Sequence, residues 1–296
     1  MEIMNRKTFG CQGEKGSFSA LAATQFASRG SFAATMTLVS FSNFDELFEA
    51  LKAGVLDYAV VPVENSTIGP IRQGVENFER LLRWRPAILS ETEIRVTYHL
   101  IGPAGSAASD VRCVYSHPMA LLQCQRYLER NRSRFTAMAD DDTAGSVKRI
   151  VEGGDIHAAA IASEFAANVY GGTILEREIG DSKDNFTRFF LLGPRGLKIV
   201  VGGRSSAAMK TSIVFRVRNH PNALAECLNI IGRHRINLAK IMSRPIRNQP
   251  WEYLFHVDFE VPSGTDGVDG MIGELKKQTQ SLDILGSYEV LGGGVR

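Results

Sequence analysis

Residues 58–66 read Tyr-Ala-Val-Val-Pro-Val-Glu-Asn-Ser, an apolar run that ends abruptly in polar side chains. An apolar run of this length predicts a buried strand. Comparable runs occur at 111–115, Val-Arg-Cys-Val-Tyr, and at 158–162, Ala-Ala-Ala-Ile-Ala. Amphipathic segments separate them, so strands and helices alternate up to about Gly196. This alternation predicts an α/β fold with a largely parallel sheet.

The segments between the strands carry helix-start signals. Ser42 and Asp45 form an S-x-x-D capping box before apolar residues at helical spacing. A single helix is predicted over 119–128, after the turn Ser116-His-Pro118. Asp142-Thr143 is the predicted N-cap of a helix over 144–151.

Polar groups follow the predicted strands at three places. At Glu64-Asn-Ser66, polar side chains at the carboxyl end of a parallel strand predict a ligand crevice, although Ser66 or Thr67 could instead cap the next helix. The glycine-rich turn 12–19 either binds an anion through its free N–H groups or only redirects the chain. At these two places, the sequence leaves both the ligand-binding and the purely structural interpretation open.

The third place is residues 181–190, Asp-Ser-Lys-Asp-Asn-Phe-Thr-Arg-Phe-Phe, where a charged turn enters an apolar strand. Thr187 and Arg188 are adjacent, so on an extended chain they point to opposite faces. Only one of them can therefore point into a given pocket. On pattern alone, the interpretation of Arg188 as a surface ion-pair partner and Thr187 as an ordinary strand residue is slightly favoured over a role in binding. The lone His117 is expected to order its turn rather than to act as a general base.

Composition narrows the classes of protein that the chain can belong to. Its 296 residues predict about two domains, and a formal net charge of +2 without a basic stripe argues against nucleic acid as a partner. The four cysteines show no metal-ligand spacing and are expected to be reduced and mostly buried. The chain has no apolar leader and no run of about 18 apolar residues, so we expect a cytoplasmic protein without a membrane partner.

The pattern changes after the glycine-rich stretch 201–206, which is interpreted as a linker with the boundary near residue 205. Residues 211–217 alternate, 221–235 form an amphipathic helix, and 251–261 keep a strict period of two. A helix at 268–280 and a strand near 284–290 follow. The order βαββαβ predicts a split ferredoxin-like sandwich.

Taken together and in order, several motifs resemble the prephenate dehydratase family. The most specific is Asn185-Phe-Thr-Arg-Phe189, preceded by Pro62-Val-Glu-Asn-Ser66, Ser116-His-Pro118 with Gln123, and Asp142-Thr-Ala144. Past the linker, the segments 219–224 and 243–245 look like parts of an ACT regulatory domain. The resemblance covers nearly the whole chain.

This resemblance implies a catalytic domain over residues 1–200, a linker over 201–209 and an ACT domain over 210–296. The catalytic domain would have two α/β lobes, like a periplasmic binding protein, with the active site in the cleft between them and no metal or organic cofactor. Thr187 carries over as the catalytic residue. The substrate-binding residues carried over are Asn65, Ser66, Ser116, Gln123, Thr143, Asn185, Arg188 and Phe189.

The implied reaction is the decarboxylating dehydration of prephenate to phenylpyruvate, a lyase step of phenylalanine biosynthesis. Hydroxide leaves poorly unless it receives a proton or strong hydrogen bonds, and the Thr187 hydroxyl could supply them. Arogenate dehydratase is the close alternative. A two-lobed amino-acid sensor without catalysis is the alternative from another class.

The resemblance also implies feedback by phenylalanine, bound at a dimer interface, and hence a homodimer or homotetramer. The allosteric residues carried over are Asn222, Ala223, Leu224, Ser243, Arg244 and Pro245. Asn222 stands where the family usually has glycine, and Met242 where it has glutamate. Asparagine tolerates a positive φ better than other non-glycine residues, so the turn can survive the first change.

Overall fold

The computed structural model describes residues 6–28, 35–67, 72–197, 209–218, 220–246, 249, 251–261 and 267–291. Internal contacts divide the chain into two compact units. The first comprises Met1–Trp84 and Thr92–Leu191, and the second comprises Arg85–Glu91 and Leu192–Arg296. The predicted boundary near residue 205 and the predicted linker over 201–206 lie outside the described residues.

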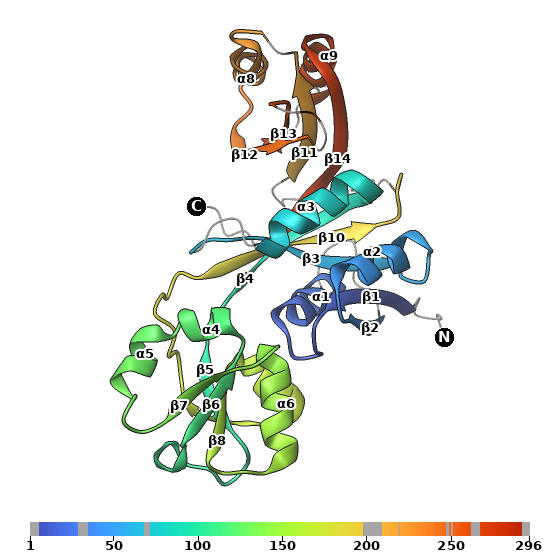
Figure 1. The fold of residues 1–296 in the computed structure, drawn as a ribbon. Helices are drawn as coiled ribbons and strands as arrows, with labels where there is room; N and C mark the ends of the chain where they lie inside the picture. The colour runs from blue at the N-terminus through green and yellow to red at the C-terminus, as the bar shows by residue number, and fades with distance from the viewer. Residues whose placement is uncertain are drawn as a thin grey trace. The chain divides into compact units, whose positions relative to one another are not determined.

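The first unit begins with an α/β lobe whose sheet is mostly buried. Its strand order is β4-β10-β3-β1-β2, and β1 pairs in parallel with both β2 and β3. Helices α1, α2 and α3 pack against these strands (Figure 1). The bounds are β1 Arg6–Gln12, α1 Phe18–Ser28, β2 Thr35–Phe41, α2 Phe44–Lys52, β3 Tyr58–Asn65, α3 Arg72–Trp84, β4 Ala87–Arg95 and β10 Phe186–Gly193.

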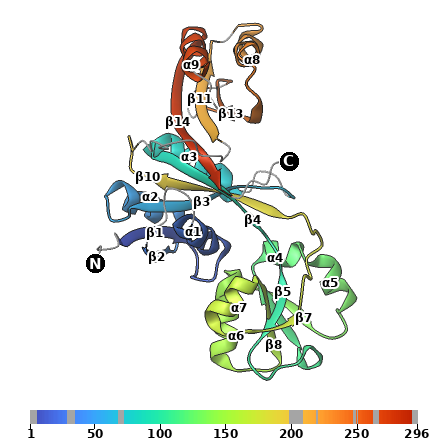
Figure 2. The same cartoon turned by 180° about the vertical axis from the view of Figure 1, so that it is seen from behind.

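A second lobe of the same unit is inserted between β4 and β10. Its sheet has the order β7-β6-β8-β5-β9, with β6 parallel to β7 and β8. Helices α6 and α7 lie side by side against it, as Figure 2 shows. The bounds are β5 His99–Gly102, β6 Cys113–Ser116, α4 Pro118–Leu122, α5 Gln125–Arg130, β7 Thr136–Ala139, α6 Thr143–Gly153, β8 Ala158–Ala162, α7 Glu164–Tyr170 and β9 Thr173–Glu176.

The chain crosses between the lobes twice, once after β4 and once before β10. This double crossover is the architecture of a periplasmic binding protein, so the two-lobed fold predicted for the first region is confirmed. The lobes also touch directly, because a Cβ atom added to Gly16 would lie 2.9 Å from the Cα atom of Ala166. Glycine at position 16 therefore permits a backbone approach that no other residue would allow.

The second unit contains the predicted βαββαβ element order, folded as an antiparallel ferredoxin-like sheet in the order β12-β13-β11-β14. Helices α8 and α9 pack together on one face, over a core that includes Ile213, Phe215, Val257 and Phe259. Alternate residues of β11 and of β13 therefore face the core, as the alternating apolar pattern of the two segments predicts. The bounds are β11 Met209–Val217, α8 Ala223–Arg233, β12 Leu238–Pro245, β13 Tyr253–Val261, α9 Gly267–Gln278 and β14 Thr279–Leu291.

Three local expectations were wrong. The N-cap of α2 is Asn43, whose side chain accepts from the Glu46 N–H, whereas Ser42 instead donates to the Glu46 carboxylate at 2.7 Å. The single helix predicted over 119–128 is two short helices, α4 and α5, interrupted at Gln123 and Cys124. The helix predicted to begin at Pro221 begins at Ala223, because Asn222 adopts a left-handed conformation with φ of 71°.

The second unit also includes a segment that the sequence pattern places in the first region. Arg85–Glu91 belongs to it, and Ser90 Oγ donates to the Glu289 carbonyl at 3.0 Å. Arg85 forms an ion pair with Asp283 in the same unit. Strand β4 therefore contributes its first residues to one unit and its last residues to the other.

Candidate functional site

A chain of buried amide and hydroxyl groups joins the ends of β3 and β10. The Asn65 amide donates to Asn185 Oδ1 at 2.7 Å and to Thr187 Oγ1 at 3.0 Å. The Asn185 amide donates in turn to Gln123 Oε1 at 2.9 Å. Asn65, Asn185 and Thr187 are 4%, 3% and 9% exposed. Because buried polar groups without partners are costly, these bonds fix the four side chains relative to one another. We call these four residues the amide cluster.

The backbone around the amide cluster is also tied in place. Ser66 and Phe186 exchange two hydrogen bonds, since Ser66 N donates to the Phe186 carbonyl and Phe186 N donates to Ser66 Oγ. Ser66 Oγ donates to the Asp184 carbonyl at 3.1 Å. The Thr67 N–H donates to Asn65 Oδ1 at 2.9 Å. Ser66 therefore aligns the start of β10 with the end of β3 through its backbone and hydroxyl.

Thr187 has a hydroxyl that accepts a bond and can still donate one. Its oxygen accepts from Asn65. Among the residues that the structure describes, none accepts the Thr187 hydroxyl hydrogen. A hydroxyl rotates to suit its partners, so this hydrogen can point to a bound molecule. The arrangement therefore provides an oriented neutral donor within a buried polar cluster.

Gln123 brings the second lobe into the amide cluster. It is the C-cap of α4, at the point where the predicted single helix is interrupted. From this position its side chain accepts a hydrogen bond from Asn185, 62 residues later in the chain. The amide cluster thus connects the two lobes of the first unit.

Two of the predicted binding residues lie elsewhere in the second lobe. Ser116 is buried at the end of β6 and donates to the Ile161 carbonyl at 2.6 Å. Of the predicted cap pair, Asp142 is the N-cap of α6, and Thr143 is already the first residue of the helix. His117 accepts from the Met119 N–H at the start of α4, so its predicted role in ordering the turn is confirmed.

The other two motif residues are not brought to the amide cluster. Arg188 forms ion pairs with Glu64 and Glu93, at 3.3 and 3.7 Å. Phe189 is 2% exposed and packs in the interior of the lobe. Thr187 and Arg188 therefore have different surroundings, as the alternation of an extended chain predicts.

The glycine-rich turn 12–19 meets the second lobe through groups that the sequence reasoning missed. Glu14 Oε2 accepts from Tyr170 OH at 3.1 Å and lies 3.5 Å from Lys148 Nζ. Asp142 Oδ2 would lie 3.3 Å from a Cβ atom added to Gly13, whose φ is 97°. No sequence spacing links these residues, which are more than 125 positions apart. Their carboxylates make the turn a poor anion site in this arrangement.

Burial raises the pKa of the Asp142 carboxyl above its ordinary value, and the nearby Glu14 carboxylate raises it further. Hydrogen bonds from the Gly145 and Ala144 N–H groups act in the opposite direction. Burial likewise raises the thiol pKa values of Cys11 and Cys124 to about 12. These thiols are therefore poor nucleophiles at neutral pH.

A second candidate site lies in the ferredoxin-like unit. It is a pocket of about 380 Å³ at the start of α8. Three of the predicted allosteric residues, Asn222, Ala223 and Leu224, line it, and the side chains of Trp251, Tyr253 and Phe255 form an aromatic wall. The other three, Ser243, Arg244 and Pro245, lie on β12 opposite Phe255, Leu254 and Tyr253 of β13.

Within the described residues, no cluster of His, Cys, Asp and Glu has the geometry to hold a metal ion. None of the helices described is both long and apolar enough to cross a membrane.

The fold and the amide cluster define a two-lobed α/β domain with an uncharged polar site, followed by a ferredoxin-like unit. Residues 9–196 match the family model of prephenate dehydratase. The bifunctional chorismate mutase/prephenate dehydratase of Aquifex aeolicus is 37% identical over 276 residues, which are 93% of this chain and 72% of that protein. The chain belongs to the prephenate dehydratase family and is a lyase.

Further relatives show the range of the family. Arogenate dehydratase/prephenate dehydratase 2 of Arabidopsis thaliana is 37% identical over 85% of this chain and 66% of its own length. The prephenate dehydratase of Arthrobacter aurescens, solved with L-Phe, has a TM-score of 0.79 and 26% identity over 95% of this chain and 90% of its own. GqqA, described as a novel type of quorum quenching acylase, has a TM-score of 0.80 and 26% identity over 97% and 99% of the two chains.

Replacement of Asp142 by asparagine should raise the thermal midpoint at pH 7. Asparagine keeps the helix cap but removes a half-buried carboxylate near Glu14. Because the folded pKa is raised, the wild-type protein loses stability as pH rises above the ordinary aspartate pKa. The difference in thermal midpoint between Asp142→Asn and the wild-type protein should therefore become smaller toward pH 4.

Thermal unfolding followed by circular dichroism at pH 4 and pH 7 measures this difference. Asp142→Ala is the matched control, because it removes the cap as well and should cost about 1 kcal/mol. A lower midpoint for Asp142→Asn at pH 7 would mean that the ionised carboxylate stabilises the fold.

Proposed function

We propose that Thr187 is the hydrogen-bond donor that assists departure of the ring hydroxyl from prephenate. The observation that carries the proposal is the bond from the Asn65 amide to Thr187 Oγ1. Among the described residues no acceptor takes the hydroxyl hydrogen, so it is available to a ligand. Such an oriented donor stabilises charge that develops only in the transition state.

The electron flow requires little else from the protein. The bond between the ring and its carboxylate breaks, carbon dioxide leaves, and the electron pair completes the aromatic ring. Across the ring, the bond between carbon and the hydroxyl oxygen breaks, and the oxygen leaves with the electron pair of that carbon–oxygen bond. A donor on this oxygen supports its departure as hydroxide, which becomes water on taking up a proton.

The uncharged character of the amide cluster supports this reaction. A cation bonded to the ring carboxylate would stabilise the substrate, in which the charge is concentrated, more than the transition state, in which it disperses. The amides of Asn65, Asn185 and Gln123 instead offer neutral groups for the polar atoms of the substrate. Ser66, Ser116, Thr143 and Phe189 remain predicted binding residues.

The same site could accept arogenate, which carries an amine in place of the keto oxygen of the side chain. The Arabidopsis relative is named for both activities. Acyl transfer, suggested by the likeness to GqqA, receives less support. A hydroxyl nucleophile needs a base that accepts its proton. Within the described residues, no histidine or carboxylate accepts from Thr187.

We also propose that phenylalanine binds the pocket at the start of α8 and regulates the enzyme. An aromatic wall and the N–H groups of a helix start suit an aromatic amino acid with a carboxylate. The Arthrobacter aurescens relative was solved with L-Phe. The left-handed Asn222 keeps the turn that the family usually builds with glycine.

We propose that the protein forms a homodimer or homotetramer through β12, the edge strand of the ferredoxin-like sheet. Within the described strands, β12 pairs on one side only, with β13. Ile241 on β12 is 46% exposed. An exposed apolar edge strand favours pairing with another chain. The cytoplasm is the proposed compartment, because all four cysteines are free thiols.

Replacement of Thr187 by alanine should lower kcat by about 10²- to 10³-fold, the effect of removing one transition-state donor. Thr187→Ser keeps the hydroxyl and should retain more activity. Release of phenylpyruvate from prephenate, and of phenylalanine from arogenate, is measured in parallel for each variant. A wild-type kcat for Thr187→Ala on both substrates would remove Thr187 from the mechanism.

Replacement of Asn222 by glycine should tighten phenylalanine binding by a few fold, because it removes a side chain from a left-handed position that lines the pocket. Isothermal titration measures the affinity. Asn229→Gly, on the exposed face of α8, controls for the substitution. If wild-type protein fails to bind millimolar phenylalanine, this pocket is not a phenylalanine site.

Replacement of Ile241 by lysine should shift the protein toward monomers, because a charged side chain disfavours edge pairing. Sedimentation equilibrium distinguishes a 32.5 kDa monomer from its multiples. Val55→Lys introduces the same charge at a residue of the first unit that is 67% exposed. It should leave the assembly unchanged, and a wild-type assembly for Ile241→Lys would exclude β12 as the interface.

A further inference from the structure

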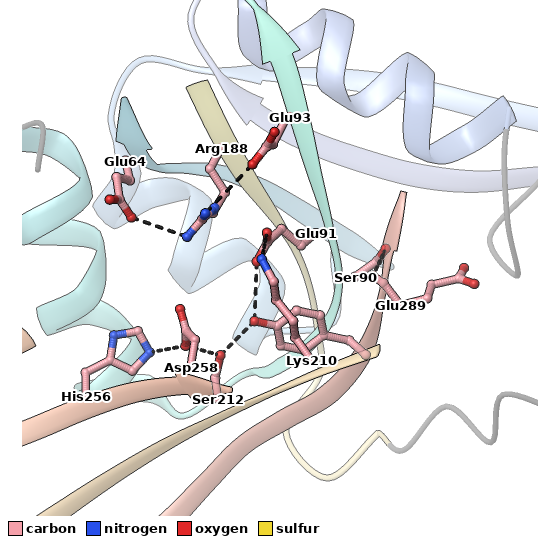
Figure 3. Close-up of polar contacts among 11 residues, drawn as sticks. Glu64, Ser90, Glu91, Glu93, Arg188, Lys210, Ser212, His256, Asp258 and Glu289 are labelled. Atoms are coloured by element: carbon pink, nitrogen blue, oxygen red, sulfur yellow. Dashed lines mark hydrogen bonds and ion pairs between the residues drawn. The ribbon is translucent and has the colours of Figure 1, made fainter. Parts of the chain in front are cut away.

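Arg188 lies between carboxylates from both neighbouring strands. Its guanidinium contacts Glu64 Oε2 of β3 at 3.3 Å and Glu93 Oε1 of β4 at 3.7 Å. The order β4-β10-β3 places the arginine on the middle strand of the three. Figure 3 shows the Arg188 side chain reaching between Glu64 and Glu93. We call these three residues the charged clamp.

The charged clamp and the amide cluster share two strands in consecutive positions. Glu64 precedes Asn65 on β3, and Arg188 follows Thr187 on β10. Side chains alternate between the two faces of a strand. On both strands one residue joins the charged clamp and its neighbour joins the amide cluster. The same strand register therefore sets both groups, one on each face.

This placement argues against Arg188 as a ligand of the substrate. A guanidinium that already pairs with two carboxylates adds no net positive charge to its surroundings, since the charged clamp carries a formal charge of −1. The alternation also directs it away from Thr187. Its fork of donors is instead suited to holding two acceptors at fixed positions.

We propose that Arg188 is a positioning residue for the dehydratase reaction. By joining β3, β10 and β4 on one face, it holds Asn65 and Thr187 in the register that forms their hydrogen bond on the other face. The inference rests on the proposed role of Thr187. A displacement of about 1 Å at a reacting group can cost about 100-fold in rate.

Arg188→Gln should lower kcat for prephenate by about 10- to 100-fold and leave KM close to the wild-type value. Arg188→Lys keeps the positive charge but lacks the forked set of donors. Its kcat should therefore lie between those of the wild-type protein and Arg188→Gln. Glu93→Gln removes one arm of the charged clamp, and provides a second test if Arg188→Gln does not fold. Arg80→Gln is the matched control, because Arg80 forms a comparable pair with Asp45 between α3 and α2. It should retain wild-type kcat.

A double-mutant cycle separates positioning from a general loss of stability. If Arg188 acts through Thr187, Arg188→Gln should have little further effect on kcat in the Thr187→Ala background. Equal fold losses in both backgrounds would overturn the proposal, as would a raised KM with unchanged kcat, or wild-type kcat in Arg188→Gln. Wild-type activity of Thr187→Ala alone would instead refute the proposed function.

Discussion

The site depends on the two hydrogen bonds donated by the Asn65 amide. One amide group holds Asn185 and Thr187 at once, and its oxygen accepts from the Thr67 N–H. This satisfies all the donors of a side chain that is 4% exposed. A residue so bonded has one orientation, since any other would bury an unpaired donor. Through Asn185 and Gln123 that orientation extends to the second lobe.

Neutral and charged side chains lie on opposite faces of the same sheet at this site. The amide cluster is neutral, and the charged clamp stands on the reverse face. The sequence alone predicts that Thr187 and Arg188 diverge, because adjacent residues of a strand must. It does not predict which of them reaches a ligand. Partners more than 90 residues away in the sequence place Thr187 in the amide cluster and Arg188 in the charged clamp.

The order and type of the elements could be read from hydrophobic periodicity, which explains why the α/β lobes and the βαββαβ unit were predicted correctly. Local exceptions followed from competition between nearby groups. Asn43 displaced Ser42 as the cap of α2, and the break at Gln123 split a helix that periodicity joined. The cap of α2 and the break at Gln123 each depend on which of several nearby groups forms a hydrogen bond. A pattern of apolar residues carries no information about that.

Contacts between distant segments were beyond the reach of the sequence. The packing of Gly16 against Ala166 and the pairing of Glu14 with Tyr170 join segments about 150 residues apart. The assignment of Arg85–Glu91 to the second unit has the same origin, because a strand of the first region meets β14. Motifs could indicate which residues matter at these places, but only the fold shows what each of them contacts.

A neutral site suits a reaction whose driving force is already in the substrate. Aromatisation supplies the free energy, so the protein gains by orienting the leaving oxygen and by leaving the ring carboxylate weakly held. A nucleophile would add nothing to such a step, and the raised pKa values of Cys11 and Cys124 keep both thiols protonated at neutral pH. On the proposed mechanism, catalytic power depends on how accurately the fold places the Thr187 hydroxyl. The hydrogen bonds and ion pairs that fix the ends of β3 and β10 on both faces of the sheet meet that requirement of the proposed mechanism.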